Sequence, residues 1–365
     1  MKIAFFLHAA AGGGAERAMI VVANKMAERG YDVDMVLAKK TGPFLEEIAP
    51  EVNLVDLGVD RIFKSFMPFS RYIKRVKPAV VISPLVGTDV IALASKIAFR
   101  WKSRLYISVQ NAPVSGATGA ALERNWPRII KAMYRFADKI TAISAGVGHE
   151  VEALMGLKPR AVEIINNPVA VDQVAKRMVE APAHPWLADK SEPVVIAVGR
   201  LTEQKDFPCL LQAFAKLRAQ RAVRLVILGE GPDRAKLEAL AADLGVQDSV
   251  SMPGFDRNPF AAMHAADVFI LSSRWEGFAN VVAEALACGT KVVSTDCPSG
   301  PAEILDNGAF GTLVPVGDAD AMAVALADAL DAPIERERLI ERSRQFSADI
   351  ICDRYLDAFG ARKAN

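Results

Sequence analysis

The chain has 365 residues with 44 basic and 43 acidic side chains, so its formal net charge at neutral pH is +1. This length predicts two domains rather than one, and the balanced charge excludes a nucleic-acid partner attracted by the overall field. Apolar residues make up 52% of the chain. No apolar run reaches the ~18–20 residues that span a bilayer, so this high apolar content is expected to come from α/β domains with buried parallel strands.

The first part of the chain is predicted to form a strand, a glycine loop, a helix and a second strand. The apolar run Lys2–Leu7 predicts the first strand, and helical spacing over Ala15–Arg29 precedes a second strand at Val33–Leu37. A strand, a crossover helix and another strand in this order imply a parallel sheet.

The loop after the first strand contains Gly12, Gly13 and Gly14. These glycines allow the backbone to approach a ligand at the start of the helix, and His8 at the end of the strand is placed to line the same site. The dinucleotide fingerprint GxGxxG fails here, because Arg17 stands where its third small residue is required.

Two acidic residues at the second strand suggest further alternatives. Asp34 is placed near the strand end, where NAD enzymes keep a ribose-binding acid, so an NAD-dependent oxidoreductase remains an alternative. Asp32 and Asp34 also spell DxD, a metal–diphosphate motif. Because they flank and enter a strand directly after a helix, we expect a strand edge there, with no metal site and no cofactor.

The segment Arg61–Lys77 mixes six basic residues with several aromatic ones, and its later part, Ser70–Val76, has helical spacing. This composition suits an anionic membrane surface or a lipid diphosphate, and it equally suits a solvated basic helix packed on the first domain. The four cysteines show no CxxC spacing or metal-ligand pattern. We therefore expect a cytoplasmic protein, with a peripheral position on the cytoplasmic membrane face as one possibility.

Further strands of the first domain are expected at Val80–Ser83, Leu105–Val109 and Lys139–Ile143. Gln110 and Asn111 follow the second of these strands, where their amide side chains can hydrogen-bond a ligand. Residues 1–180 are expected to form this domain, and the proline-containing segment 181–193 is expected to be a linker.

The second domain, residues 194–345, repeats the alternation of strands and helices. Its first strand, Val194–Val198, is followed by Arg200 and Lys205. Open α/β sheets bind ligands at the carboxyl ends of their strands. Two cations at this position can pair with a diphosphate, the arginine as a fork and the lysine as a point charge.

The stretch SRWEGFANVVAEALACGTKVV predicts a loop, a helix over Ala279–Ala287 and a strand over Lys291–Thr295. The first backbone N–H groups of a helix have no internal partner and lie at the positive end of its dipole, so the start of this helix can hold a phosphate. Glu276 lies in the loop, and Glu284, eight residues later, lies two turns into the helix. Two carboxylates thus flank the predicted anion site.

This stretch resembles the Glu-x7-Glu motif of retaining glycosyltransferases of family 4, which have the GT-B fold. Other matches are the glycine loop GGAER, the segment NNPV at Asn166–Val169, GRL-x3-K around Arg200 and Lys205, and the turn at Gly229. The resemblance implies two doubly wound Rossmann-like domains facing a cleft. It also implies that a helix in 346–365, at about Ile350–Phe359, crosses back to the first domain.

The resemblance further implies roles for individual residues. Glu276 would bind the donor sugar, Glu284 the nucleotide ribose, and Arg200 and Lys205 the diphosphate; Glu276, Arg200 and Lys205 would form the catalytic set. The donor-binding set would be Gly13, Gly14, Arg200, Lys205, Gly229, Phe255, Glu276, Gly277, Phe278, Ala279, Asn280, Val281 and Glu284, with Phe255 beside the nucleobase. The acceptor-side set would be His8, Gln110 and Asn111.

The implied activity is transfer of a hexose or N-acetylhexosamine from a nucleotide-sugar to a hydroxyl of a glycan or lipid-linked glycan acceptor, with the anomeric configuration retained. UDP is favoured as the nucleotide, and GDP-mannose remains open. Many family members carry histidine where Gln110 stands, which puts histidine-assisted chemistry at that position in doubt. A non-catalytic nucleotide-sugar-binding protein is a second alternative.

Overall fold

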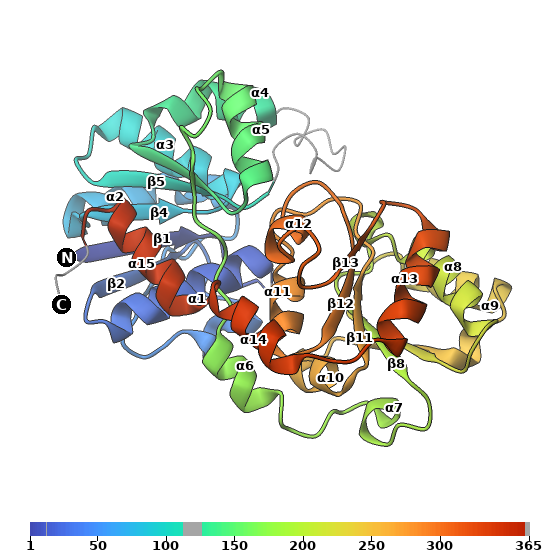
Figure 1. Cartoon of the computed structure of the whole chain (residues 1–365). Helices are drawn as coiled ribbons and strands as arrows, with labels where there is room; N and C mark the ends of the chain where they lie inside the picture. Colours follow the sequence, from blue (N-terminus) through green and yellow to red (C-terminus); the bar gives the residue numbers. More distant parts are fainter. Residues whose placement is uncertain (12, 112–125, 362–365) are drawn as a thin grey trace. The chain divides into compact units, whose positions relative to one another are not determined.

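The computed structural model describes residues 1–11, 13–111 and 126–361, and divides into two compact units (Figure 1). The first unit comprises Met1–Pro168 and the segment that begins at Phe346; the second comprises Val169–Gln345. Each unit is built on one parallel sheet covered by helices. The predicted α/β class with two Rossmann-like domains is therefore confirmed.

Among the described residues, the sheet of the first unit has seven strands in the order β3-β2-β1-β4-β5-β6-β7. Each strand runs parallel to its neighbours, as in β1 and β2, where Ile3 pairs with Val33. Long apolar runs fill the central strands because both faces of this sheet are covered. The strands are β1 (Lys2–Leu7), β2 (Asp32–Leu37), β3 (Asn53–Asp56), β4 (Val80–Ser83), β5 (Arg104–Val109), β6 (Lys139–Ala142) and β7 (Glu163–Ile164).

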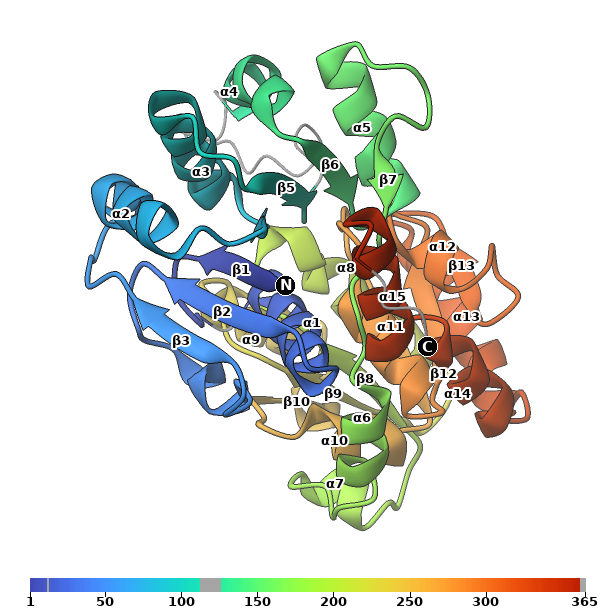
Figure 2. The ribbon, with the colours of Figure 1, turned by 90° about the vertical axis from the view of Figure 1, so that its left-hand side faces the viewer.

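Helices cover the two faces of this sheet (Figure 2). Ile3, Phe5 and Leu7 face α1 and α15 in one hydrophobic core. The next side chain along the strand, Phe6, points to the opposite face and stacks on Phe69 of α2 with ring centroids 4.0 Å apart. The helices of this unit are α1 (Gly14–Glu28), η1 (Pro43–Glu47), η2 (Ile62–Ser65), α2 (Phe66–Val76), α3 (Val86–Phe99), α4 (Trp126–Met133), η4 (Tyr134–Phe136), α5 (Ala145–Met155) and α15 (Ala348–Ala358).

The last helix, α15, completes the core of the first unit. The Tyr355 hydroxyl lies 2.9 Å from the Ser108 Oγ atom on β5, and the Tyr106 hydroxyl donates to the Ala358 carbonyl at 2.9 Å. Arg29 at the end of α1 pairs with Asp349 at 2.8 Å. Residues far apart in sequence thus close one face of the sheet, where α15 lies beside α1.

Among the described residues, the second unit has six parallel strands in the order β10-β9-β8-β11-β12-β13, with β8 near the centre. Its main core joins these strands to α8, α9 and α13. The strands are β8 (Val194–Val198), β9 (Arg224–Leu228), β10 (Val250–Gly254), β11 (Val268–Leu271), β12 (Lys291–Thr295) and β13 (Thr312–Val314). The helices are α6 (Val171–Arg177), α7 (Pro185–Ala188), η5 (Glu203–Lys205), α8 (Phe207–Arg218), α9 (Arg234–Asp243), η6 (Gln247–Ser249), α10 (Pro259–Ala265), α11 (Asn280–Ala287), α12 (Pro301–Ile304), α13 (Ala319–Asp331) and α14 (Arg336–Arg344).

The division between the units differs from the expected boundaries at residues 180 and 193. Helix α6 contacts α10 and α11, and its Val174 side chain is buried. The Arg177 guanidinium lies over the Phe260 ring at 5.5 Å, and its carbonyl accepts a hydrogen bond from Asn258 at 3.0 Å. The second unit therefore begins at Val169, and the expected linker 181–193 packs as part of it.

Asp34 is a structural residue of the first unit. It lies in the amino-terminal half of β2, is only 1% exposed, and its Oδ2 atom accepts a hydrogen bond from the Tyr72 hydroxyl at 2.6 Å. Its Oδ1 atom accepts from Lys2 at 3.2 Å and from Asn53 at 2.9 Å. The interpretation of Asp34 as a ribose ligand at the strand end is wrong, because the carboxylate is enclosed at the other end of the strand.

Asp89 in the first turn of α3 is a buried carboxyl group. Its Oδ2 atom accepts a hydrogen bond from the Tyr134 hydroxyl at 2.6 Å, whereas its Oδ1 atom has no partner among the described residues. Burial raises the pKa of Asp89 to about 8, although the hydrogen bond from Tyr134 favours the charged form. The group is therefore mostly protonated at neutral pH.

We expect the substitution Asp89→Asn to remove a pH dependence of stability. An aspartate in an unfolded chain titrates near pH ~4, so unfolding of the wild type releases a proton at any pH between about 4 and 8. Its free energy of unfolding should fall across this window by up to about 1.4 kcal/mol per pH unit, whereas the neutral amide does not titrate.

Denaturant unfolding of both proteins at about pH 5 and about pH 8 measures this effect. The variant should gain stability relative to the wild type at the higher pH. A stability difference that stays constant between the two pH values would contradict a protonated Asp89.

Candidate functional site

The site of the second unit lies at the carboxyl ends of β8 and β11. These strands are neighbours, but the chain proceeds from β8 outward to β9 and β10 on one side and from β11 to β12 and β13 on the other. The loops after β8 and β11 therefore diverge, which is the arrangement that forms a ligand-binding crevice in open α/β sheets. Arg200 and Lys205 follow β8, and Glu276 follows β11.

Lys205 and Glu276 join the two loops by an ion pair. The Lys205 Nζ atom lies 2.6 Å from Glu276 Oε1, and the two side chains are only 13% and 9% exposed. Ser273 donates a second hydrogen bond to the same oxygen at 2.6 Å. The other oxygen, Oε2, has no hydrogen-bond partner among the described residues.

Further hydrogen bonds fix the two loops to each other. Ser272 donates to the Lys205 carbonyl at 2.6 Å, and the Gln204 side chain donates to the Trp275 carbonyl at 2.9 Å. The Arg274 backbone N–H donates to the Gln204 carbonyl at 2.8 Å. Lys205 and Glu276 are thus held by backbone positions that cannot shift independently. Arg200, in contrast, is exposed at the edge of the same loop.

Glycines allow the strand ends to crowd together around this pair. Gly229 has φ +141°, and a Cβ atom there would lie 1.9 Å from the Gly199 carbonyl oxygen. Gly300 has φ +99°, and its Cβ would lie 2.4 Å from the Phe278 carbonyl oxygen. Side chains at these positions would push the loops after β8 and β11 away from their neighbours, so Gly229 has a packing role at the site.

Helix α11 begins at Asn280, one residue later than expected, because Ala279 adopts the left-handed conformation with φ 65°. Phe278 and Ala279 are 2% and 4% exposed, so their side chains pack inside the second unit. Val281 lies in the first turn and Glu284 in the second, and both are partly exposed. The helix start and Glu284 follow directly from the Glu276 loop, with Gly277 buried between them.

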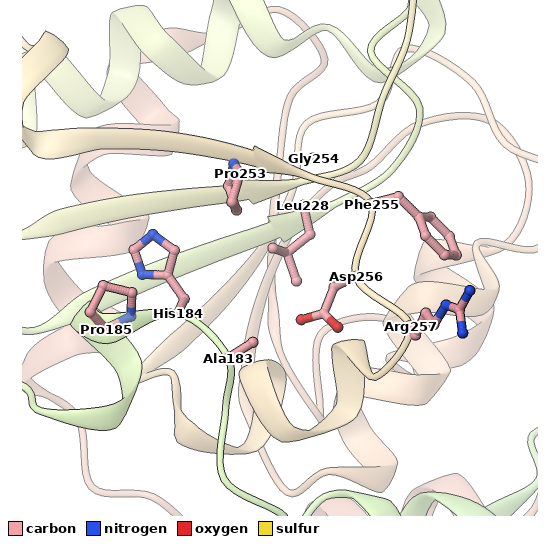
Figure 3. Close-up of a pocket in the computed structure, with 9 residues that line it drawn as sticks. All are labelled: Ala183, His184, Pro185, Leu228, Pro253, Gly254, Phe255, Asp256 and Arg257. Carbon is pink, nitrogen blue, oxygen red and sulfur yellow. The ribbon is translucent and has the colours of Figure 1, made fainter.

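A pocket of about 530 Å³ lies beside the carboxyl ends of β9 and β10 (Figure 3). The Phe255 side chain is 68% exposed, and in Figure 3 the Asp256 carboxylate points toward the segment that contains Ala183 and His184. The residues that line the pocket are Ala183, His184, Pro185, Leu228, Pro253, Gly254, Phe255, Asp256 and Arg257.

His184 closes one side of this pocket as a neutral imidazole. Its Nδ1 atom accepts a hydrogen bond from the Trp186 backbone N–H at 3.2 Å, so the proton lies on Nε2, which is 2.9 Å from the Ser251 hydroxyl. Burial and the nearby charge of Arg224 lower the pKa of His184.

The glycine loop of the first unit also lies at a point where strand order reverses, because β1 is the neighbour of both β2 and β4. Gly13 caps α1, and Gly14 is its first residue, one position earlier than expected. A Cβ atom on Gly13 would lie 2.3 Å from the Glu16 carboxylate. His8 is exposed at the end of β1, with its Nε2 atom 3.4 Å from the Asp60 carbonyl oxygen. Gly12 lies outside the described residues.

Gln110 directly follows β5 and is a buried amide that is 5% exposed. Its Nε2 atom donates to Ser108 Oγ at 3.1 Å, but its carbonyl oxygen Oε1 has no hydrogen-bond partner among the described residues. A buried unpartnered oxygen is unusual, which makes Gln110 a candidate ligand-binding residue of the first unit. Asn111 beside it is exposed.

The predicted residues thus form two groups, each at the carboxyl edge of one sheet. Arg200, Lys205, Gly229, Phe255, Glu276–Val281 and Glu284 lie in the second unit, and His8, Gly13, Gly14, Gln110 and Asn111 lie in the first. Two parts of the site were not predicted from the sequence. Ser273 lies only three residues before Glu276, and this spacing was a weak signal for their hydrogen bond. The contribution of residues 183–185 to the pocket had no sequence signal.

The described residues hold no group of three His, Cys, Asp or Glu side chains arranged to bind a metal ion. In the same part of the chain, no helix combines the length and apolar character needed to cross a membrane.

Two family models match the chain. The model described as Glycosyltransferase Family 4 matches residues 12–173, and the model described as Glycosyl transferases group 1 matches residues 182–346. The lipopolysaccharide core biosynthesis glycosyltransferase LpsE of Rhizobium meliloti is 31% identical over 99% of this chain and 100% of its own length.

Solved structures show the same architecture. The chain is similar to Anabaena Alr3699/HepE in complex with UDP-glucose, with a TM-score of 0.81, 19% identity and coverage of 99% of this chain and 100% of that one. The lipopolysaccharide outer core galactosyltransferase WaaB matches with a TM-score of 0.75, 21% identity and 99% of each chain. The resemblance and the expected transferase activity are confirmed: this chain belongs to the group 1 glycosyltransferases and has their GT-B fold.

Proposed function

We propose that this glycosyltransferase transfers a hexose or N-acetylhexosamine from a UDP-sugar to a hydroxyl of a glycan or lipid-linked glycan, with retention of anomeric configuration. The observation that carries the proposal is the Lys205–Glu276 pair at the switch point of the second sheet, with Arg200 in the same loop as Lys205. Relatives named for lipopolysaccharide core biosynthesis and for a diphospho-undecaprenol acceptor support the acceptor class. A neighbour solved with UDP-glucose supports the donor.

In this proposal the donor diphosphate binds against Arg200, Lys205 and the first turn of α11. Departure of the nucleoside diphosphate adds negative charge to its terminal phosphate, and the two cations, of which Lys205 is held in place by Glu276, stabilise that charge. Lys205 has three ammonium protons, so it can bond the phosphate and keep Glu276 in place. These groups take the role that a metal ion has elsewhere, and we propose that neither a metal nor another cofactor takes part.

Glu276 is assigned to the sugar. Its Oε1 atom is occupied by Lys205 and Ser273, which leaves Oε2 to accept hydrogen bonds from sugar hydroxyls. Such contacts orient the anomeric carbon as it gains oxocarbenium character. Glu284, one turn inside α11, is assigned to the ribose hydroxyls, and the backbone around Gly254 and Phe255 to the nucleobase.

The acceptor is assigned to the carboxyl edge of the first sheet, where the unpartnered Oε1 atom of Gln110 can accept a hydrogen bond from an acceptor hydroxyl. His8 and Asn111 are exposed at the same edge. The proton of the attacking hydroxyl passes to the leaving diphosphate. We place the enzyme in the cytoplasm, at the face of the membrane where a lipid-linked acceptor is available.

The donor assignment predicts that UDP stabilises the protein in the presence of excess EDTA, whereas GDP and ADP do so weakly. Ligand at 100-fold over its Kd adds about 2.7 kcal/mol to the free energy of unfolding, which a thermal shift measures. Release of UDP from UDP-hexoses and UDP-N-acetylhexosamines should also survive EDTA. Selective stabilisation by GDP would contradict the choice of nucleotide, and activity that returns only with Mn²⁺ would contradict metal independence.

The diphosphate assignment predicts that Arg200→Ala and Lys205→Ala each lower kcat/KM by about 10²–10³, the scale on which one preorganised donor to a developing anion acts. Lys236→Ala is the matched control, because Lys236 is 82% exposed on α9 in the same unit. Steady-state kinetics of all three variants measure the effect. Near-normal turnover of both site variants would contradict the assignment of Arg200 and Lys205 to the donor diphosphate.

The two carboxylates should fail in different ways. Glu276→Gln still accepts the hydrogen bonds from Lys205 and Ser273 but loses its charge, so turnover should fall by about 10² while affinity for free UDP stays near normal. Glu284→Ala should instead weaken UDP binding, because a ribose contact is similar in the ground and transition states.

Calorimetric titration with UDP separates the two cases, with Glu238→Ala on α9 as the control. If Glu276→Gln loses UDP affinity while Glu284→Ala keeps it, the two roles are exchanged.

A further inference from the structure

Positive charge is concentrated in one stretch of a chain whose net charge is only +1. Residues 61–111 contain one acidic residue, Asp89, which is buried and mostly protonated at neutral pH. The same stretch contains ten basic residues, Arg61, Lys64, Arg71, Lys74, Arg75, Lys77, Lys96, Arg100, Lys102 and Arg104.

The fold brings this charge onto one side of the first sheet. Helix α3 contacts η2 and α2 along one flank and α4 and η4 along the other, and Figure 2 shows α2, α3 and α4 on the face away from α1 and α15. Met67, Arg71, Lys74 and Arg75 recur at helical spacing and form the exposed stripe of α2. Among the described residues, Arg71, Lys74 and Arg100 form no ion pair.

Large apolar side chains are exposed on the same elements. Phe63 of η2 is 56% exposed, Met67 of α2 45%, and Phe99 at the end of α3 51%. The Phe99 ring lies 5.9 Å from the Phe66 ring, which joins the end of α3 to α2. On the other flank Phe136 is 42% exposed, with the Arg135 guanidinium 4.9 Å from its ring.

We propose that this surface docks on an anionic phospholipid bilayer, with Phe63, Met67 and Phe99 inserted at the interface and Lys64, Arg71 and Arg100 on the lipid phosphates. We call these six residues the α2–α3 surface. The inference rests on the proposed lipid-linked acceptor, since docking would hold the first unit where such an acceptor lies. The proposed surface includes part of the basic segment Arg61–Lys77 and, in addition, Phe99 and Arg100 at the end of α3.

Complementary chemistry selects the bilayer over other partners. Each Lys or Arg near an anionic membrane contributes about 1 kcal/mol, and aromatic and aliphatic side chains beside them add the apolar contact that interfacial helices use. Interfacial binding of this kind draws on two signals, the buried apolar area and the electrostatic attraction to anionic lipids. The α2–α3 surface combines both signals on contacting elements.

Vesicle sedimentation tests the proposal with phosphatidylcholine vesicles and with vesicles that contain phosphatidylglycerol as about one lipid in four. The wild type should bind only the anionic vesicles, and binding should weaken as salt rises. The double variant Arg71→Gln/Arg100→Gln should bind about fivefold more weakly for each charge removed. The variant Phe63→Ser/Phe99→Ser should also lose affinity, because the apolar contact is gone.

Lys236→Gln/Arg338→Gln is the matched control, since both residues are exposed in the second unit. UDP affinity, measured on each variant, should equal that of the wild type, which separates loss of docking from loss of the donor site. Equal binding to both vesicle types, or variants that bind as tightly as the wild type, would overturn the proposal. Self-association of the wild type that these variants abolish, without vesicle binding, would overturn it in favour of a protein interface.

Discussion

The site of the second unit depends on the ion pair between Lys205 and Glu276. A pair that is about nine-tenths buried loses most of its hydration, and this cost is offset only when geometry and additional hydrogen bonds are good. Ser273 supplies such a bond, and the Ser272–Lys205 and Gln204–Trp275 contacts fix the backbone on both sides. A cation and a carboxylate are therefore held side by side by contacts within the second unit.

The position of the pair follows from sheet topology. Because the chain leaves β8 in one direction and returns at β11 to continue in the other, no crossover helix fills the space between their loops. Two glycines then let backbone segments pack closely, because a Cβ atom on Gly229 would collide with the Gly199 backbone and one on Gly300 with the Phe278 backbone. The loops that carry the pair are thus fixed by close backbone packing.

The two faces of the first sheet meet different requirements. One face is closed by α1 and α15, with Tyr355 and Tyr106 hydrogen-bonded across the joint. The other carries α2, α3 and α4, whose outer surface keeps both charge and exposed aromatic side chains in a chain that is otherwise balanced. Core packing explains the first arrangement. It does not explain exposed Phe63 and Phe99, since burying either would lower the free energy of the fold.

The sequence by itself determined the fold class and many elements. Lys2–Leu7, Val194–Val198 and Lys291–Thr295 form strands with the expected bounds, because an apolar run must be buried wherever it lies. The start of α11 was misplaced by one residue, since the left-handed conformation of Ala279 is imposed by its surroundings rather than by its own preference.

Only the tertiary structure decided which residues meet. Asp34 is occupied by Tyr72 and Lys2, the segment 181–193 packs on the second unit, and Lys205 meets Glu276 across seventy-one positions of sequence. Local patterns encode burial and periodicity, whereas partners distant in the chain are chosen by strand order.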